Sequence, residues 1–141
     1  MLNEQIENIM QYYKEEKNKS FSDNSLARLI RHTLPENLVT SSKLSNEYLV
    51  YGSSGKGNWA EVPWIGIFDK SITKSAQSGY YIVYLFDAEL NRVYLSLNQG
   101  WTQFEKRYGR KIGLEKISEK AEELQKKLRS TLSDFTFNII D

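Results

Sequence analysis

Gly79 to Asn98 read GYYIVYLFDAELNRVYLSLN, the segment with the clearest secondary-structure pattern in the chain. Its first part, Gly79–Asp87, is aromatic and β-branched throughout, and this composition favours a strand. AELNR follows as a tight turn, and Arg92–Asn98 returns as a second strand. The segment is therefore predicted to form a β-hairpin.

Two more strand candidates precede this hairpin. Glu47–Ser53 is apolar and rich in β-forming residues. Val62–Asp69 is the next candidate, and Pro63 stands at its start, where a missing N–H group is tolerated. Because consecutive strands are joined by short connections, the sheet is predicted to be mostly antiparallel.

Helical patterns come before the strands. Leu2–Lys17 has apolar residues at three- and four-residue steps, which indicates an amphipathic helix. A second, short helix is predicted over Ser25–His32, with Asp23 or Asn24 as its N-cap and Pro35 marking its end.

Helical patterns also follow the strands. WTQFEKRYG, from Trp101 to Gly109, predicts a short helix, and Gly109 and Gly113 are interpreted as breaks. Leu114–Leu132 then predicts an amphipathic helix, and the final SDFTFNIID alternates like a strand. The predicted fold class is α+β: a mostly antiparallel sheet flanked by N- and C-terminal helices. Residues 1–141 are expected to be one domain and the N-terminal part of a longer protein.

The composition excludes several classes of site. The 141 residues include no cysteine, so disulfides and thiolate chemistry are excluded. No apolar run reaches the roughly 18 residues that a membrane span needs, and the charged N-terminus is unlike a secretory signal, so we expect a cytoplasmic protein without membrane contact. The net charge is only +1, but Ser53–Lys111 holds eight Lys and Arg against five Asp and Glu, and eleven of the 18 aromatic residues.

Catalytic patterns are weak. GSSGKG has too few residues between its glycines for a phosphate-binding loop and lacks the hydroxyl residue after the lysine. The single histidine, His32, cannot build a histidine-rich metal site. Carboxylates near the strand ends, Glu61, Asp69, Asp87 and Glu89, leave a metal-dependent nuclease or hydrolase as an alternative, although the Asp…Glu-x-Lys pattern of two-metal nucleases is absent. We predict no catalytic residue, no metal and no cofactor.

Most of the aromatic residues around the strands are expected in the sheet core, but their number leaves nucleic-acid binding open. Along the strand Gly79–Asp87, Tyr81 and Leu85 point to one face, whereas Tyr80, Tyr84 and Phe86 point to the other, so they cannot all fill one core. Aromatic side chains beside basic ones suit stacking on bases combined with phosphate contacts. A protein-interaction module, in which the aromatic face meets another domain, remains a further alternative. The basic residues considered for phosphate contacts are Lys56, Lys70, Lys74 and Arg92.

One combination of residues resembles a known family. It covers about residues 45–105 and comprises Gly55, Gly57, Asn58, Trp59, Pro63 and Trp64, then Gly79, Tyr81, Val83, Leu85 and Phe86, then Val93–Leu97. In this order and spacing they resemble the N-terminal DNA-recognition domain of McrB-type, modified-cytosine-dependent restriction endonucleases.

The resemblance implies a DNA-binding module rather than an enzyme. By position it implies that a methylated cytosine, rotated out of duplex DNA, enters a pocket formed by Trp64, Tyr81 and Leu85. It implies a motor or nuclease partner on a following segment or another chain. Lys56 is a departure, because base-flipping members carry an aromatic residue there, and Trp59 is expected in the core. The loop expected to contact DNA contains Ser54, Gly55, Lys56, Gly57 and Asn58, and the expected phosphate contacts are Lys70, Lys74 and Arg92.

Overall fold

A computed structural model describes residues 2–129 and confirms the α+β class. The described chain forms two compact units, residues 2–76 with 80–98, and residues 77–79 with 99–129. Within these residues, no helix has both the length and the apolar character needed to cross a membrane. The elements are α1 (Leu2–Glu16), α2 (Ser25–Arg28), the π-helix η1 (Leu29–Thr33), α3 (Leu34–Ser41), β1 (Tyr48–Ser53), β2 (Trp64–Asp69), β3 (Tyr80–Phe86), β4 (Val93–Gln99) and α4 (Trp101–Leu128).

The first unit contains a four-stranded sheet in the order β1-β2-β3-β4. β1 pairs with β2 and β2 with β3, both antiparallel, and Trp64 lies opposite Leu85. The Asp87 N–H donates to the Arg92 carbonyl at 3.1 Å, where β3 turns into β4. The predicted hairpin is therefore confirmed, and each observed strand agrees with its predicted range to within two residues.

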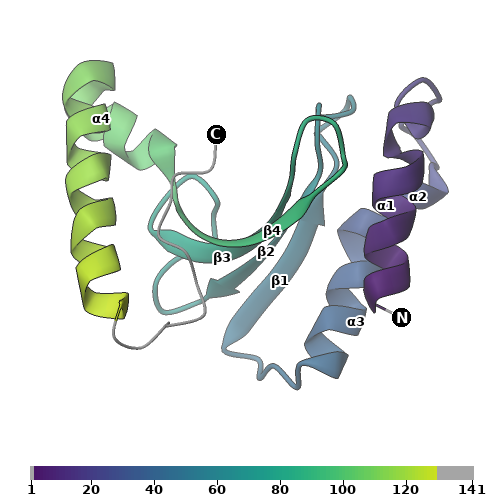
Figure 1. Cartoon of the computed structure of the whole chain (residues 1–141), viewed down its shortest axis with the longest axis horizontal. Helices are drawn as coiled ribbons and strands as arrows, with labels where there is room; N and C mark the ends of the chain where they lie inside the picture. Colours follow the sequence, from purple (N-terminus) through teal and green to yellow (C-terminus); the bar gives the residue numbers. More distant parts are fainter. Residues whose placement is uncertain (1, 130–141) are drawn as a thin grey trace. The chain divides into compact units, whose positions relative to one another are not determined.

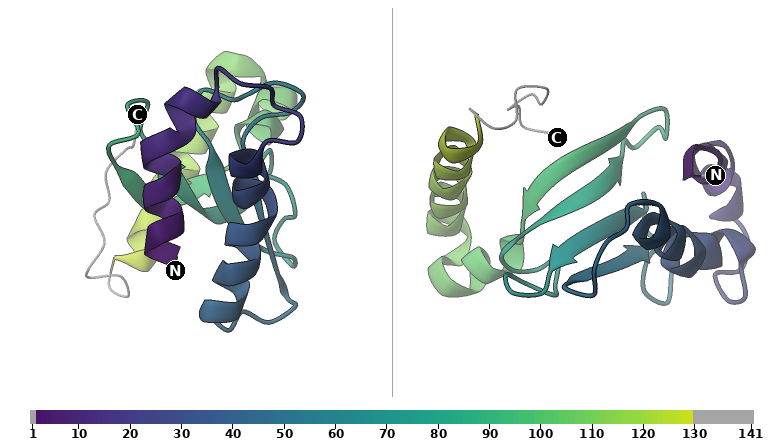
Figure 2. Two further views of the ribbon diagram at one scale, coloured as in Figure 1. Left: turned by 90° about the vertical axis from the view of Figure 1, so that its right-hand side faces the viewer. Right: turned by 90° about the horizontal axis from the view of Figure 1, so that it is seen from below.

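The core of the first unit lies between α1, α2, η1 and α3 and one face of the sheet (Figures 1 and 2). At Gly52 in β1, an added Cβ would lie 1.9 Å from the Ile30 carbonyl oxygen, so only glycine lets η1 approach the strand this closely. Burial of each large apolar side chain contributes about 1.5–3 kcal/mol. The buried core residues are Ile9, Tyr13, Leu26, Ile30, Leu34, Leu38, Ile65, Phe86 and Leu90.

The second helical segment differs from the prediction. Asn24 is the N-cap, and its side-chain oxygen accepts the N–H groups of Leu26 and Ala27 at 2.9 and 3.0 Å. The helix does not end at Pro35, however, and the expected end was wrong. The wider turn of η1 intervenes, and Pro35 then occupies the first turn of α3, where a missing N–H group costs little.

The second unit contains α4, which is interrupted at Gly109 by a non-helical backbone with φ 77°. The predicted break at Gly109 is confirmed, but Gly113 continues the helix. It is buried, and an added Cβ would lie 3.1 Å from both the Phe104 carbonyl and the Trp101 ring. The Gly79 N–H donates to the Gln103 side chain at 2.9 Å in the same unit. The strand predicted over 133–141 lies outside the described residues.

Candidate nucleic-acid interface

The face of the sheet opposite α1, η1 and α3, here called the aromatic face, carries rings that contact one another. The Tyr51 and Phe68 rings stack with centroids 4.8 Å apart, and Tyr81 stacks on the other side of Phe68 at 4.8 Å. The Trp64 ring meets Tyr51 edge-on at 5.5 Å. Gly66 lies beneath this group, since an added Cβ would come within 2.5 Å of the Phe68 ring. The rings therefore form one continuous layer on β1, β2 and β3.

The structure separates the three residues predicted to form the base pocket. Trp64 and Leu85 are direct cross-strand partners, so their side chains lie side by side on the aromatic face. Tyr81 shares that face but lies four residues from Leu85 along β3, a distance of about 13 Å at 3.3 Å per residue. Tyr81 thus belongs to the Phe68 end of the face and Leu85 to the Trp64 end.

At the Phe68 end, the connection after β2 covers the rings. The Tyr81 hydroxyl donates to the Ala76 carbonyl at 3.0 Å, and the Tyr51 hydroxyl donates to the Lys74 carbonyl at 3.4 Å. Burial raises the pKa of both tyrosines, so both hydroxyls stay protonated as donors at neutral pH. Phe68 beneath them is fully buried.

At the Trp64 end, Tyr94 extends the layer. The bonds of Asp87 to Arg92 and of Gly100 to Gly79 give β3 and β4 one register, in which Tyr94 lies opposite Leu85. Hydrogen bonding to the Tyr94 side chain raises the pKa of the exposed Arg92. Trp64, Leu85 and Tyr94 thus form a row of partly buried side chains across the sheet. Tyr94 was missed as a site residue because its position depends on the β3–β4 register.

The loop expected to contact DNA, here called the Lys56 loop (residues 54–60), is a closed turn. The Ala60 N–H donates to the Ser54 carbonyl at 2.8 Å. Gly55 has φ +116°, and a Cβ there would lie 2.0 Å from the Asn58 carbonyl oxygen. Ser54 is fully buried at the base, whereas the exposed tip consists of Lys56, Gly57 and Asn58. Trp59 packs against the core, as predicted.

The predicted phosphate contacts divide between the two ends of the sheet. The connections β1–β2 and β3–β4 lie at one end, so the Lys56 loop and Arg92 lie there with the Trp64 row. Lys70 and Lys74 follow β2 and lie at the opposite end, where the Lys70 ammonium donates to the Asn46 carbonyl. Exposed basic side chains therefore border the aromatic face at both ends.

The carboxylates of the hydrolase alternative do not form one site. Asp69 ends β2 and accepts the Ser71 hydroxyl at 2.7 Å, which lowers the pKa of its carboxyl group. Asp87 follows β3 at the other end of the sheet and accepts the N–H of Asn91 at 2.8 Å. Among residues 2–129, no group of three acidic or histidine side chains could hold a metal ion.

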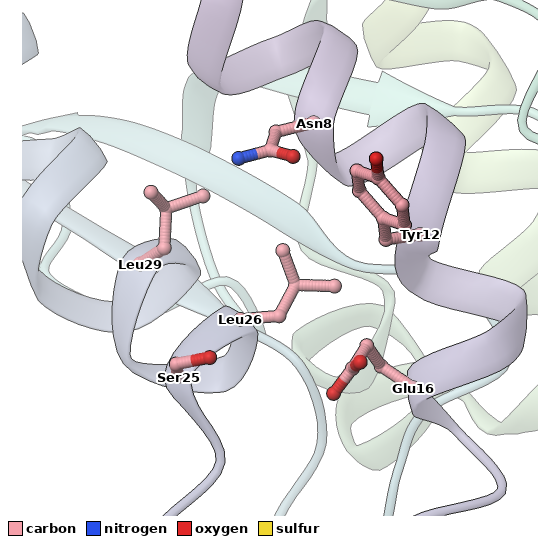
Figure 3. Close-up of a pocket in the computed structure, with 6 residues that line it drawn as sticks. All are labelled: Asn8, Tyr12, Glu16, Ser25, Leu26 and Leu29. Atoms are coloured by element: carbon pink, nitrogen blue, oxygen red, sulfur yellow. The ribbon is translucent and has the colours of Figure 1, made fainter.

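A cavity of about 260 Å³ lies between α1 and the α2–η1 segment (Figure 3). Figure 3 shows Asn8 and Tyr12 on α1, and Leu26 and Leu29 on the facing segment, around this cavity. None of the residues predicted to contact DNA lines this cavity, which is lined by Asn8, Tyr12, Glu16, Ser25, Leu26 and Leu29.

Comparison with known proteins identifies the family. No curated protein and no solved structure matches the chain. The family model described as MrcB-like, N-terminal domain matches residues 8–141, which is nearly the whole chain. This range includes the Lys56 loop, the aromatic face and Arg92. The expected resemblance is confirmed, and the chain belongs to the MrcB-like N-terminal domain family, a module of McrB-type restriction systems.

Proposed function

We propose that this chain is the DNA-binding specificity module of a modification-dependent restriction system, and that it recognises methylated cytosine in duplex DNA. The observation that carries the proposal is the row of Trp64, Leu85 and Tyr94, which lies at the same end of the sheet as the exposed Lys56 tip and Arg92. Family membership supports the same role. In this proposal the chain itself does not cleave DNA, and a motor or nuclease partner on a following segment or another chain supplies the further activities.

In this proposal, Trp64 and Leu85 contact the modified base after it rotates out of the duplex. A flat pyrimidine stacks on the indole ring, and its 5-methyl group meets the apolar Leu85 side chain on the neighbouring strand. Strand spacing of about 4.8 Å puts the two side chains within reach of one base. Tyr81 supports the layer through Phe68, because its hydroxyl group is engaged by Ala76.

Phosphate contacts supply the rest of the binding free energy. Stacking of one base contributes about 1–3 kcal/mol, which is similar to the few kcal/mol that unstacking costs. Lys56 and Arg92 at one end, and Lys70 and Lys74 at the other, are the proposed contacts. Lys56 reaches a phosphate or a base edge, since its side chain cannot fill the gap in the duplex as a ring would. Because binding depends on few cations, it is weak and falls with salt.

The test measures, by fluorescence anisotropy at low salt, the affinity of the chain for two duplexes of the same sequence. One duplex contains 5-methylcytosine and the other contains cytosine at the same position. The wild-type chain is expected to prefer the methylated duplex, and Trp64→Ala to lose that preference while non-specific binding remains. Tyr48→Ala removes an exposed ring outside the aromatic layer and serves as the control. The proposal fails if neither duplex binds the wild-type chain better than about 10⁻⁴ M. Equal loss on both duplexes in Trp64→Ala contradicts a base contact.

A protein-interaction role is the second candidate, because three large apolar side chains on β3 and β4 are exposed. Ile82, Leu95 and Leu97 are each more than two-fifths exposed. Sedimentation of the 141-residue chain separates the two functions. A tight homodimer that binds no DNA would favour the interaction role, whereas a DNA-binding monomer supports the specificity module.

A further inference from the structure

The Lys56 loop is held from inside the core by a tyrosine of α1. Tyr13 is fully buried, and its hydroxyl group lies 2.7 Å from the Ala60 carbonyl oxygen and 3.3 Å from the Ser54 carbonyl oxygen. A hydroxyl group has one hydrogen, so the shorter contact carries the main hydrogen bond, and the Ser54 carbonyl lies alongside. These carbonyls belong to the first and last residues of the loop, so one side-chain atom contacts both its ends.

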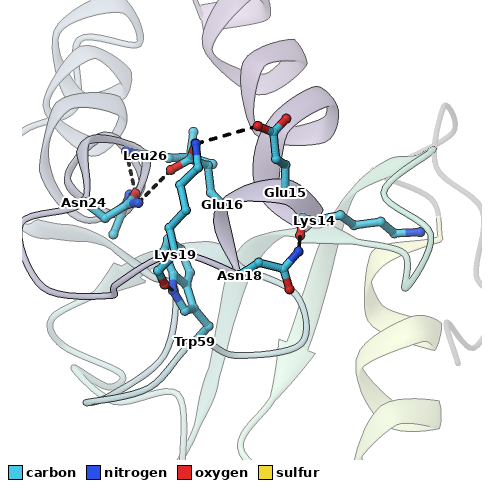
Figure 4. Close-up of polar contacts among 9 residues, drawn as sticks. Lys14, Glu15, Glu16, Asn18, Lys19, Asn24, Leu26 and Trp59 are labelled. Carbon is cyan, nitrogen blue, oxygen red and sulfur yellow. Dashed lines mark hydrogen bonds and ion pairs between the residues drawn. The ribbon is translucent and has the colours of Figure 1, made fainter.

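Neighbouring residues of α1 hold the segment that follows the loop tip. The Trp59 ring meets the Tyr13 ring edge-on at 5.5 Å, and its Nε1–H donates to the Lys19 carbonyl at 3.0 Å (Figure 4). The Lys17 ammonium donates to the Glu61 carbonyl at 3.1 Å. Trp59, Ala60 and Glu61 are therefore each bonded to α1 or the turn after it.

The bond from Tyr13 is maintained across the physiological pH range. Burial raises the pKa of Tyr13 to about 12, so the hydroxyl group remains protonated as a donor. Ser54 contributes no second anchor, because its buried hydroxyl oxygen has no hydrogen-bond partner among the described residues. The hydroxyl group of Tyr13 therefore holds the base of the loop together with the Ala60–Ser54 backbone bond.

We propose that Tyr13 is a positioning residue for DNA binding: its hydroxyl group holds the Ala60 end of the Lys56 loop, which the Ala60–Ser54 backbone bond joins to the other end, so that the loop presents Lys56, Gly57 and Asn58 in one conformation. This role rests on the proposed function, because it assumes that the loop tip contacts DNA. Loss of the hydroxyl group leaves the Ala60 carbonyl without its donor, and a single such bond corresponds to about 1 kcal/mol, or a fivefold change in an equilibrium constant.

The test compares Tyr13→Phe with Tyr12→Phe in the 141-residue chain. Both variants lose one hydroxyl group from α1, but Tyr12 is 41% exposed and lines the cavity that faces α2 and η1. Three quantities are measured: the hydrogen-exchange rate of the Ala60 amide, the exchange rate of the Ile65 amide in β2, and the affinity for the methylated duplex. Tyr13→Phe is expected to raise the Ala60 rate and weaken DNA binding, each about fivefold, and to leave the Ile65 rate unchanged. Tyr12→Phe should change none of them.

Gly55→Ala provides a second variant, which disturbs the loop without removing the Tyr13 hydroxyl group. The added Cβ would meet the Asn58 carbonyl oxygen, so the loop must change conformation. We expect Gly55→Ala to weaken DNA binding. The double variant that combines Tyr13→Phe with Gly55→Ala should bind no more weakly than Gly55→Ala alone, because both changes act on one loop. Additive losses in the double variant would overturn the proposed role.

The outcomes separate the two proposals. If the wild-type chain binds DNA but Tyr13→Phe leaves the Ala60 exchange rate unchanged, Tyr13 does not hold the loop and only its positioning role is overturned. The positioning role is also overturned if the Ala60 rate rises while DNA affinity stays the same. If the wild-type chain binds no duplex, the proposed function fails, and the positioning role in DNA binding fails with it.

Discussion

The two ends of the aromatic face are built from similar side chains but differ in what covers them. At the Phe68 end, two tyrosine hydroxyls donate to carbonyls of the β2–β3 connection, and the phenylalanine beneath is fully buried. At the Trp64 end, Trp64, Leu85 and Tyr94 remain partly exposed, and the exposed Lys56 tip lies at the same end of the sheet. Aromatic composition alone therefore does not identify a binding surface. What distinguishes the ends is whether the β2–β3 connection bonds to the rings.

The largest expected effect comes from removing the ring at the covered end. Phe68→Ala deletes a fully buried side chain that stacks on two tyrosines, so we expect the free energy of unfolding to fall by about 3–5 kcal/mol. Ile72→Ala, a change at an exposed position after β2, should alter it by less than about 0.5 kcal/mol. Urea denaturation measures both. Equal effects of the two substitutions would show that the Phe68 end is not a packed core.

An intermediate effect is expected where the two ends meet. The Cβ added by Gly66→Ala would lie 2.5 Å from the Phe68 ring and 3.2 Å from the Trp64 ring. We expect overpacking to reduce the free energy of unfolding by about 1–3 kcal/mol, again measured in urea. An unchanged stability would mean that both rings move aside without cost, and the ends would then be independent of each other.

The smallest expected effect on stability comes from removing the Tyr81 hydroxyl group, and this change tests most directly which end of the aromatic face binds DNA. Tyr81→Phe removes the donor to the Ala76 carbonyl and should cost about 1 kcal/mol of unfolding free energy. The Tyr81→Phe variant should still prefer methylated DNA, because in the wild-type chain the Tyr81 hydroxyl group is bonded to Ala76 and does not contact the base. Tyr80→Phe makes the same chemical change on the opposite face of β3 and is the control. Loss of the preference in Tyr81→Phe, with normal stability, would assign the base contact to the covered end.

The Tyr81 bond also has a pH dependence. Burial raises the pKa of Tyr81 in the folded chain above the value of about 10 in an unfolded chain. The stabilisation is complete below about pH 10, because both states are then protonated, and it is lost as the pH rises through the folded value. In urea titrations above pH 10, Tyr81→Phe should therefore show a shallower loss of stability with pH than the wild-type chain.

The sequence predicted the features that depend on local pattern. The aromatic and β-branched run at Gly79–Asp87 predicted the hairpin, and the side-chain alternation correctly separated Tyr81 from Tyr84. Features that depend on register or on unusual backbone were missed. The alternation of side chains does not reveal that Leu85 pairs with Trp64 on the neighbouring strand. Nor does it reveal that Tyr81, about 13 Å from Leu85 along β3, lies at the other end of the aromatic face. Pro35 suggested the end of a helix, but the π-turn of η1 leaves it in the first turn of α3.

The strand order described above also bears on how the chain folds. Each strand of the order β1-β2-β3-β4 pairs with the next strand in sequence, so the sheet forms by closing short loops. The contacts of α1 span much more chain, since Tyr13 and Ala60 are 47 residues apart and Lys14 and Glu89 are 75 apart. Contacts between distant residues carry the larger entropic cost of closure. We therefore expect the sheet to assemble before α1 docks, and the Lys56 loop to acquire its final conformation in a late, long-range step of folding.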